Sequence, residues 1–125
     1  GDAAAAWRNV ACPKCGAEME PWVRSWVFLE GKKYHEEHNK LNAFLKKNMH
    51  KKVLFLELGV GRMTPMFIQE PFWDLTYAWP GAFYITINPR DAIVPDELKN
   101  KGMAIREDIA KVLADTRKIF SGEMK

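Results

Sequence analysis

The segment 52–65 constrains the fold of this chain more than any other part of the sequence. It opens with a nearly continuous apolar run over 53–58, which favours a strand covered on both faces in a parallel α/β sheet. The run ends in Gly59-Val60-Gly61, where glycine permits unusual backbone angles and the close approach of another group. Thr64 and Pro65 then have the residue types expected at the N-cap and at the first position of a helix.

A strand that leads through a glycine turn into a helix aims backbone N–H groups and a helix N-terminus at one point. This geometry favours an anion, usually a phosphate, so a nucleotide-binding turn is the first hypothesis. A tight turn that binds nothing is an equal alternative, because the full dinucleotide fingerprint has a third glycine that is absent here.

The rest of the chain alternates between patterns typical of strands and of helices. Apolar residues at helical spacing predict a helix over 34–50 and another over 107–120. A further helix is expected over 65–78, interrupted at Pro71 because the residue before a proline avoids helical angles. Strands are expected over 82–87 and 102–106, a short helix start near 95–98, and a β-prone segment over 21–30. This order predicts an α/β fold containing half of a doubly wound, Rossmann-like parallel sheet.

Composition limits the classes of protein to which the chain can belong. Its 125 residues suit one domain or part of one, and a hydrophobic fraction of 47% can form a core. A net charge of +3 is too small to indicate nucleic-acid binding. No apolar run approaches the roughly 20 residues that span a bilayer, and no signal peptide is recognisable, so we expect no membrane partner and a cytoplasmic location.

The two cysteines form a Cys12-Pro-Lys-Cys15-Gly16 motif, which is typical of a zinc knuckle. A redox Cys-x-x-Cys normally begins a helix, whereas Met19-Glu20-Pro21 does not resemble a helix start, so zinc is favoured over redox chemistry. A structural zinc site needs four ligands, and Cys12 and Cys15 supply two. His35 and His38 are nearby candidates, but their spacing is short and they fall within the expected helix.

These motifs, taken in order, resemble the C-terminal half of a sirtuin. The resemblance rests on the knuckle, on a strand leading into Gly59-Val60-Gly61 and Thr64-Pro65, on a second strand ending in Ile87-Asn88, and on a last helix of the type Glu-Asp-Ile-Ala-x-Val-Leu. The strand and knuckle sequences are most similar to the macrodomain-linked (class M) sirtuins of bacteria and fungi. The resemblance covers nearly everything after Val10.

This resemblance implies a function and a set of partners. Sirtuins bind NAD between a Rossmann domain and a smaller zinc-containing module. The macrodomain-linked branch implies NAD-dependent ADP-ribosylation of a lipoylated glycine-cleavage H-like carrier protein, rather than deacylation of lysine, and a macrodomain protein as a further partner. The run of alanines near the N-terminus indicates that residues 1–9 are a linker or expression-derived lead. By the resemblance, 10–33 are part of the zinc module and 34–125 the C-terminal part of the NAD-binding domain.

The chain also departs from the sirtuin pattern. Common sirtuins have Gly-Thr-Ser where this chain has Gly59-Val60-Gly61, which replaces a hydroxyl contact by backbone alone. The family's N-terminal half, with its Gly-Ala-Gly loop, nicotinamide pocket and first Cys-x-x-Cys, has no counterpart in these residues. We therefore expect a fragment that is inactive alone, whose zinc half-site is completed by two upstream cysteines, and which self-associates through an exposed sheet edge.

The predicted site combines both lines of argument. Position at the glycine turn assigns Gly59, Val60, Gly61 and Thr64 to the diphosphate and adenosine-ribose side of an NAD site. Position at a strand end assigns Asn88 to the adenosine ribose, and the resemblance assigns the backbone of Ile105 and Arg106 to the edge of the adenine. Two alternatives remain: an S-adenosylmethionine-dependent methyltransferase, whose acidic-x-Gly-x-Gly turn fits residues 57–61, and a non-catalytic zinc-bearing scaffold.

Overall fold

The computed structural model describes residues 10–19 and 31–122. It divides the chain into two units, Gly1–Lys40 and Leu41–Lys125, and the division falls within helix α2 (Lys32–Asn48). The expected lead over 1–9 and the β-prone segment 21–30 lie outside the described residues.

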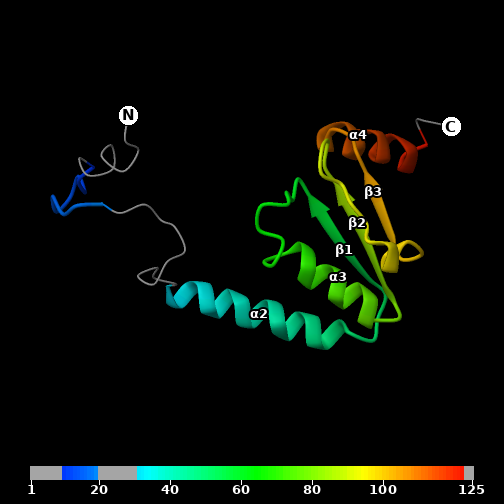
Figure 1. Cartoon of the computed structure of the whole chain (residues 1–125), viewed down its shortest axis with the longest axis horizontal. Helices are drawn as coiled ribbons and strands as arrows, with labels where there is room; N and C mark the ends of the chain where they lie inside the picture. Colours follow the sequence, from blue (N-terminus) through cyan, green and yellow to red (C-terminus); the bar gives the residue numbers. More distant parts are fainter. Residues whose placement is uncertain (1–9, 20–30, 123–125) are drawn as a thin grey trace. The chain divides into compact units, whose positions relative to one another are not determined.

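A parallel sheet of three strands, in the order β1-β2-β3, forms the centre of the second unit (Figure 1). Strand β1 spans Val53–Leu58, β2 spans Ala82–Ile87 and β3 spans Gly102–Ile105. All three strands are confirmed where the sequence predicts them, with β3 ending one residue early. The α/β class and the parallel pairing of the strands are therefore confirmed as well.

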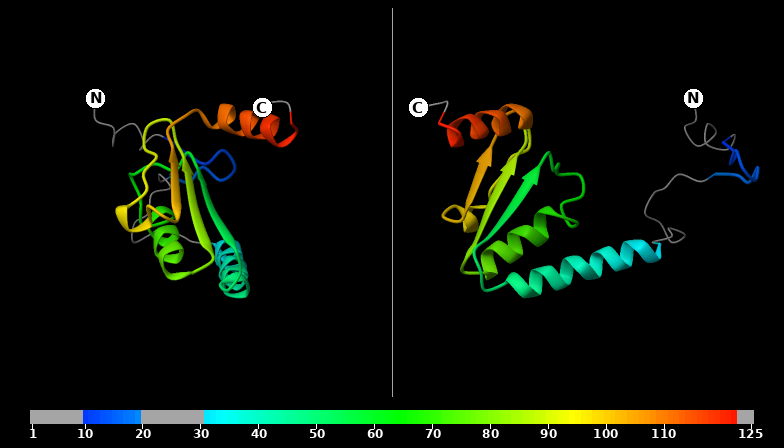
Figure 2. Two further views of the ribbon diagram at one scale, coloured as in Figure 1. Left: turned by 90° about the vertical axis from the view of Figure 1, so that its right-hand side faces the viewer. Right: turned by 180° about the vertical axis from the view of Figure 1, so that it is seen from behind.

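Both connections between the strands lie on the same face of the sheet. Helix α3 (Gln69–Ala78) joins β1 to β2, and the short 3-10 helix η1 (Asp96–Leu98) joins β2 to β3. Helix α3 contacts both of the first two strands and also η1. Figure 2 shows α3 and η1 together on one side of the three strands.

The core lies between the sheet and α3. Phe55 of β1 is 4% exposed, and its ring centre lies 4.9 Å from that of Phe72 and 5.6 Å from that of Trp79. Tyr84 of β2 is fully buried beside them. Rings tilted at such distances add packing energy beyond the burial of their area, so this aromatic cluster fixes α3 on the sheet.

The expected helix start at Thr64 and Pro65 is wrong, because α3 begins only at Gln69. Nor is the helix interrupted at Pro71, which lies in its first turn. The position of this proline explains both differences. A proline in a first turn loses no helical hydrogen bond, whereas a helix begun at Pro65 would place Pro71 in its interior, where its ring clashes with a preceding carbonyl.

The expectation that the first strand is covered on both faces is also wrong. Phe55 and Glu57 are buried under α3, but the alternate residues Leu54, Leu56 and Leu58 are 53%, 42% and 44% exposed. Consecutive side chains of a strand point to opposite faces, so the described part of the chain covers one face and leaves the other open.

The last helix, α4, spans Ile109–Phe120 and starts two residues later than expected, with Asp108 as its N-cap. Helix α2 occupies the region predicted for the first helix, beginning and ending two residues early. Within residues 10–19 and 31–122, the structure contains no helix both long and apolar enough to cross a membrane.

Candidate functional site

The carboxyl ends of the three strands meet at one edge of the sheet. The N–H of Gly59, just after β1, donates to the carbonyl of Ile87 over 2.9 Å. The N–H of Asn88, just after β2, donates to the carbonyl of Ile105 over 3.1 Å. The parallel hydrogen-bonding pattern thus continues one residue past the strands and brings Gly59, Asn88 and Ile105 side by side. Open α/β sheets bind their ligands at this end.

The glycine turn has two glycines with different roles. Gly59 has a φ of 70°, in the left-handed region that favours glycine, and an added Cβ would lie 3.2 Å from Cδ1 of Ile109. At Gly61 an added Cβ would meet no atom within 4 Å. The fold therefore requires Gly59, whereas Gly61 leaves open space on the outer side of the turn.

The backbone N–H groups of Val60 and Gly61 have no hydrogen-bond acceptor within the described part of the chain. They follow the carboxyl end of β1, where the outer side of Gly61 is open. Backbone N–H groups in such turns can hold an anion without a helix. The residues present therefore fit a phosphate group through their backbone, although α3 does not begin at this turn.

Thr64 lies farther along the same loop and is exposed. Its carbonyl accepts a hydrogen bond of 3.3 Å from the N–H of Phe67, and the carbonyl of Pro65 accepts one of 2.8 Å from Glu70. The segment is therefore a turn that leads into α3, and Thr64 is not a helix N-cap. Its assignment to a nucleotide site stays a prediction without the helix-end argument.

Asn88 joins the two loops that follow β1 and β2. Its Nδ2 donates to the carbonyl of Val60 over 3.1 Å, and its Oδ1 accepts from the N–H groups of Arg90 and Asp91 over 2.8 and 3.0 Å. The residue is 8% exposed. A side-chain amide has two N–H donors, so one remains for a ligand while the other holds the glycine turn.

Arg106 follows β3 at the same edge. Its Nε donates to the carbonyl of Ala92 over 3.3 Å, which connects the end of β3 to the loop after β2. Ile105 is half-buried, and its carbonyl is already engaged by the N–H of Asn88. Of the seven predicted nucleotide-site residues, hydrogen bonds join Val60, Asn88 and Ile105 directly. Gly59 and Arg106 lie at the same edge but are bonded to Ile87 and Ala92.

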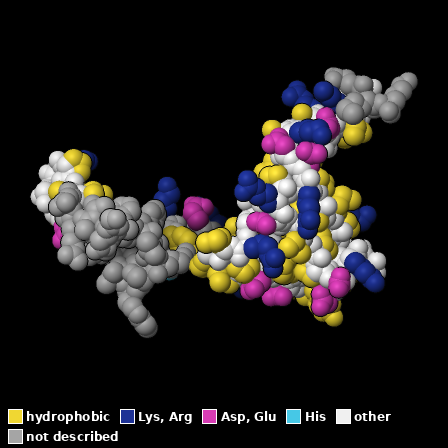
Figure 3. Space-filling view, turned by 45° about the horizontal axis from the view of Figure 1, so that its top comes forward, with side chains coloured by type: hydrophobic (Ala, Val, Ile, Leu, Met, Phe, Trp, Pro, Cys, Tyr) yellow, Lys and Arg dark blue, Asp and Glu magenta, His cyan; other side chains and the backbone are white. Residues whose placement is uncertain are grey.

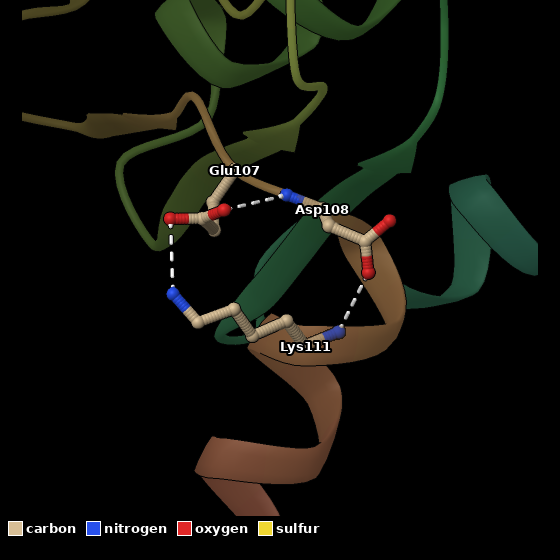
Figure 4. A network of polar contacts seen from close by, with 3 residues as sticks. All are labelled: Glu107, Asp108 and Lys111. Atoms are coloured by element: carbon tan, nitrogen blue, oxygen red, sulfur yellow. Dashed lines mark hydrogen bonds and ion pairs between the residues drawn. The ribbon is translucent and has the colours of Figure 1, made fainter.

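The start of α4 is satisfied by its own side chains (Figure 4). Oδ1 of Asp108 accepts from the N–H of Lys111 over 2.9 Å, and Nζ of Lys111 donates to Oε2 of Glu107 over 3.2 Å. The N–H of Asp108 and the Lys111 side chain lower the pKa of Glu107. Two carboxylates therefore occupy this helix end, and a phosphate would be repelled from it.

The knuckle residues form a tight turn in the first unit. The N–H of Cys12 donates to the carbonyl of Ala17, and the N–H of Gly16 donates to the carbonyl of Cys12, each over 2.8 Å. Gly16 has a φ of 72°, and both cysteines are free thiols. Hydrogen bonds from the backbone N–H groups of Cys15 and Lys14 lower the pKa of the Cys12 thiol, which suits a metal ligand.

The described residues show no complete metal site. Across 10–19 and 31–122, no group of three or more His, Cys, Asp or Glu side chains could hold an ion. His35 and His38 are exposed in α2, and the ring of His38 stacks on Tyr34 with centres 6.2 Å apart. Cys12 and Cys15 fit half of a zinc site, and the zinc assignment stays a prediction.

The sequence argument missed a buried polar pair beneath α3. The hydroxyl of Tyr84 donates to Oε2 of Glu57 over 2.6 Å, and the two side chains are 0% and 1% exposed. Burial raises the pKa of Glu57, against the opposing effect of this hydrogen bond. Burial and the bond to Glu57 raise the pKa of Tyr84 to about 12. The sequence feature that could have revealed this pair is Glu57, an acid within an otherwise apolar strand.

Comparison with known proteins gives one informative match. No model of a known protein family matches the chain. The chain is 34% identical over 104 residues to a protein named "Protein ADP-ribosyltransferase" from Staphylococcus aureus strain Mu50. The aligned region covers 82% of this chain and 33% of the relative, so the chain spans about a third of the relative's length.

Proposed function

We propose that this chain is the NAD-binding portion of a protein ADP-ribosyltransferase. The observation that carries the reaction class is the 34% identity, over 82% of the chain, to a protein of that name. The strand-end edge supports a nucleotide, because it combines a glycine turn that has free N–H groups with a polar side chain at the next strand end.

In this proposal, each residue at the strand-end edge contacts a particular part of NAD. The N–H groups of Val60 and Gly61 hold the diphosphate, and the remaining N–H of Asn88 donates to the adenosine ribose. The backbone of Ile105 and Arg106 borders the adenine, and Thr64 lies on the ribose side. The bound NAD would supply the ADP-ribosyl group, with nicotinamide as its leaving group.

The finer assignment is a sirtuin-type enzyme of the macrodomain-linked branch. Its support is the sequence resemblance, which also names a lipoylated carrier protein as the acceptor and lysine deacylation as the alternative reaction. In this proposal Cys12 and Cys15 are half of a structural zinc site in the intact enzyme.

We expect no group transfer by the 125-residue chain alone. Breaking the nicotinamide bond requires groups that stabilise the developing positive charge on the ribose. The side chain of Glu57 is engaged with Tyr84 beneath α3. Asp91 follows Asn88, to which its backbone N–H is bonded, on the side assigned to the adenosine ribose.

Two assays test this proposal. Thermal-shift measurements with NAD, ADP-ribose and S-adenosylmethionine should give stabilisation by the first two only, because a ligand that binds the folded state raises its stability. Stabilisation by S-adenosylmethionine alone would favour the methyltransferase reading. Stabilisation by none would remove the cofactor assignment.

The second assay incubates the chain with labelled NAD and a lipoylated carrier protein. It should show no transfer by the chain alone, and transfer above background would contradict that expectation.

A further inference from the structure

A cavity opens between α3 and η1, on the covered side of the sheet. Its volume is about 270 Å³, just below the roughly 300–1,000 Å³ of pockets that enclose a whole small molecule. We call it the α3–η1 cavity, and six residues line it: Trp73, Asp74, Tyr77, Pro95, Glu97 and Leu98. Its size suits one large side chain of a partner better than a whole cofactor.

Two aromatic residues of α3 line this cavity together. Trp73 and Tyr77 are four residues apart, so they lie one turn apart on the same side of the helix. Nε1 of Trp73 is buried, so the indole lines the cavity with ring carbons and not with its N–H donor. Tyr77 is 71% exposed, whereas Leu98 is 2% exposed at the inner end of the cavity. Aromatic rings at such a site attract a cation placed over their faces.

The two charged residues that line the cavity are both acids. Asp74 belongs to α3 and Glu97 to η1, so the carboxylates come from two different elements. Within the described part of the chain, neither carboxylate has a hydrogen-bond or ion-pair partner. Lys101, which follows η1, does not neutralise them, because its Nζ donates to the carbonyls of Thr76 and Trp79. The cavity therefore combines two aromatic rings with two uncompensated negative charges.

The surface as a whole does not select for a basic partner. Figure 3 shows Lys and Arg side chains alongside Asp and Glu ones on the unit Leu41–Lys125, and the whole chain has a net charge of +3. Exposed ion pairs are individually weak. Selection of a cation therefore depends on the local combination of rings and acids in the cavity.

We propose that the α3–η1 cavity binds an arginine side chain of a partner protein. A guanidinium group is planar, stacks on aromatic rings and donates to carboxylates through a fork of N–H groups, which matches both features of the cavity. A lysine ammonium is a compact, strongly hydrated charge and gains less from the rings. An anion would meet two carboxylates, and an apolar side chain would leave both of them without a partner.

This proposal is independent of the proposed cofactor site, because the two sites lie toward opposite ends of the strands. The glycine turn follows the carboxyl end of β1. The cavity instead lies toward the amino ends, since α3 ends shortly before β2 begins and the N–H of Lys101, just before β3, donates to the carbonyl of Leu98.

The test titrates the isotope-labelled 125-residue chain with arginine blocked at both ends as its acetyl methylamide, followed by NMR. Saturable shifts should appear at the indole signal of Trp73 and at the amides of Asp74, Tyr77 and Glu97. Blocked lysine should bind more weakly, and blocked norleucine, which has no charge, should give no shifts. Equal binding of lysine or norleucine would overturn the proposal. Tighter binding of free L-arginine than of the blocked form would also overturn it, in favour of a free amino acid.

The double variant Asp74→Asn/Glu97→Gln keeps the size of both side chains and removes both charges. It should weaken binding of blocked arginine at least tenfold and keep its urea midpoint, because neither carboxylate has a partner to lose. Tyr77→Leu should weaken binding about threefold through the loss of one exposed cation–π contact. Glu70→Gln is the matched control, since Glu70 is an exposed acid of α3 that does not line the cavity. Unchanged binding by the double variant, or no shifts with blocked arginine, would overturn the proposal.

Discussion

The hydroxyl of Tyr84 donates a 2.6 Å hydrogen bond to Oε2 of Glu57, and both side chains are buried between β1, β2 and α3. Tyr84→Phe removes the donor and leaves a buried carboxyl oxygen without a partner. The free energy of unfolding should fall by about 1–3 kcal/mol. Urea denaturation followed by tryptophan fluorescence measures this. A change within error would show that the pair contributes nothing to stability.

The pH dependence of stability should report the ionisation of Glu57. Burial raises its folded-state pKa above the ordinary 4.5, so the folded state binds a proton more tightly than the unfolded state does. Stability should therefore fall as pH rises from about 4.5 through the folded-state pKa. Glu57→Gln should lose this segment of the pH profile. The difference between the urea midpoints of the two proteins, followed across this range, checks the prediction, and parallel profiles would contradict it.

Asn88→Ala should lower both the stability of the fold and the affinity of the proposed site for NAD. It removes the bond to the Val60 carbonyl and both bonds from the N–H groups of Arg90 and Asp91. NAD affinity should fall by about 1–2 kcal/mol through the lost polar contact. Calorimetric titration of the intact enzyme measures it.

Asn88→Asp is the matched variant for this prediction. It keeps the oxygen that accepts from Arg90 and Asp91 but loses the donor to Val60 and to the ribose. It should therefore bind NAD as poorly as Asn88→Ala while losing less stability. Full affinity in Asn88→Asp would remove Asn88 from the site.

The cysteine pair should bind zinc incompletely in this chain. Two thiols satisfy half of a tetrahedral site, so metal analysis of the purified chain should find less than one tightly bound zinc per molecule. Cys12→Ser should abolish whatever binding remains. One tightly held zinc per chain would contradict the half-site and direct attention to His35 and His38.

The sequence predicted the strands well because their signal is local. An apolar run such as 53–58 predicts a strand whatever surrounds it, and the strand-end positions of Gly59 and Asn88 follow directly. The start of α3 was missed because Thr64-Pro65 has the residue types of a helix start, while the competing effect of Pro71 depends on where the helix already lies.

The buried pair was missed for a different reason. The pair depends on which face of β1 receives α3, and a strand that is apolar at every position but Glu57 shows no alternation that would identify this face. The hydrogen bond from Asn88 to the Val60 carbonyl depends in turn on the register between β1 and β2. Such long-range contacts leave no local pattern in the sequence.

Gly61→Val gives the sharpest control for the cofactor assignment. An added Cβ at this position meets no atom within 4 Å, so the variant should keep its urea midpoint. It should nevertheless lose nucleotide binding, because the branched side chain occupies the space through which a diphosphate would approach Val60 and Gly61. A change at Gly59 would not separate these effects, since its φ of 70° disfavours any side chain.

The central claim is that the strand-end edge binds the ADP-ribose part of NAD, and residue-resolved NMR of the labelled chain tests it most directly. Titration with ADP-ribose into the millimolar range should shift the amide signals of Val60, Gly61, Asn88, Ile105 and Arg106, and Gly61→Val should abolish these shifts. An absence of shifts at these amides, or equal shifts produced by S-adenosylmethionine, would contradict the claim.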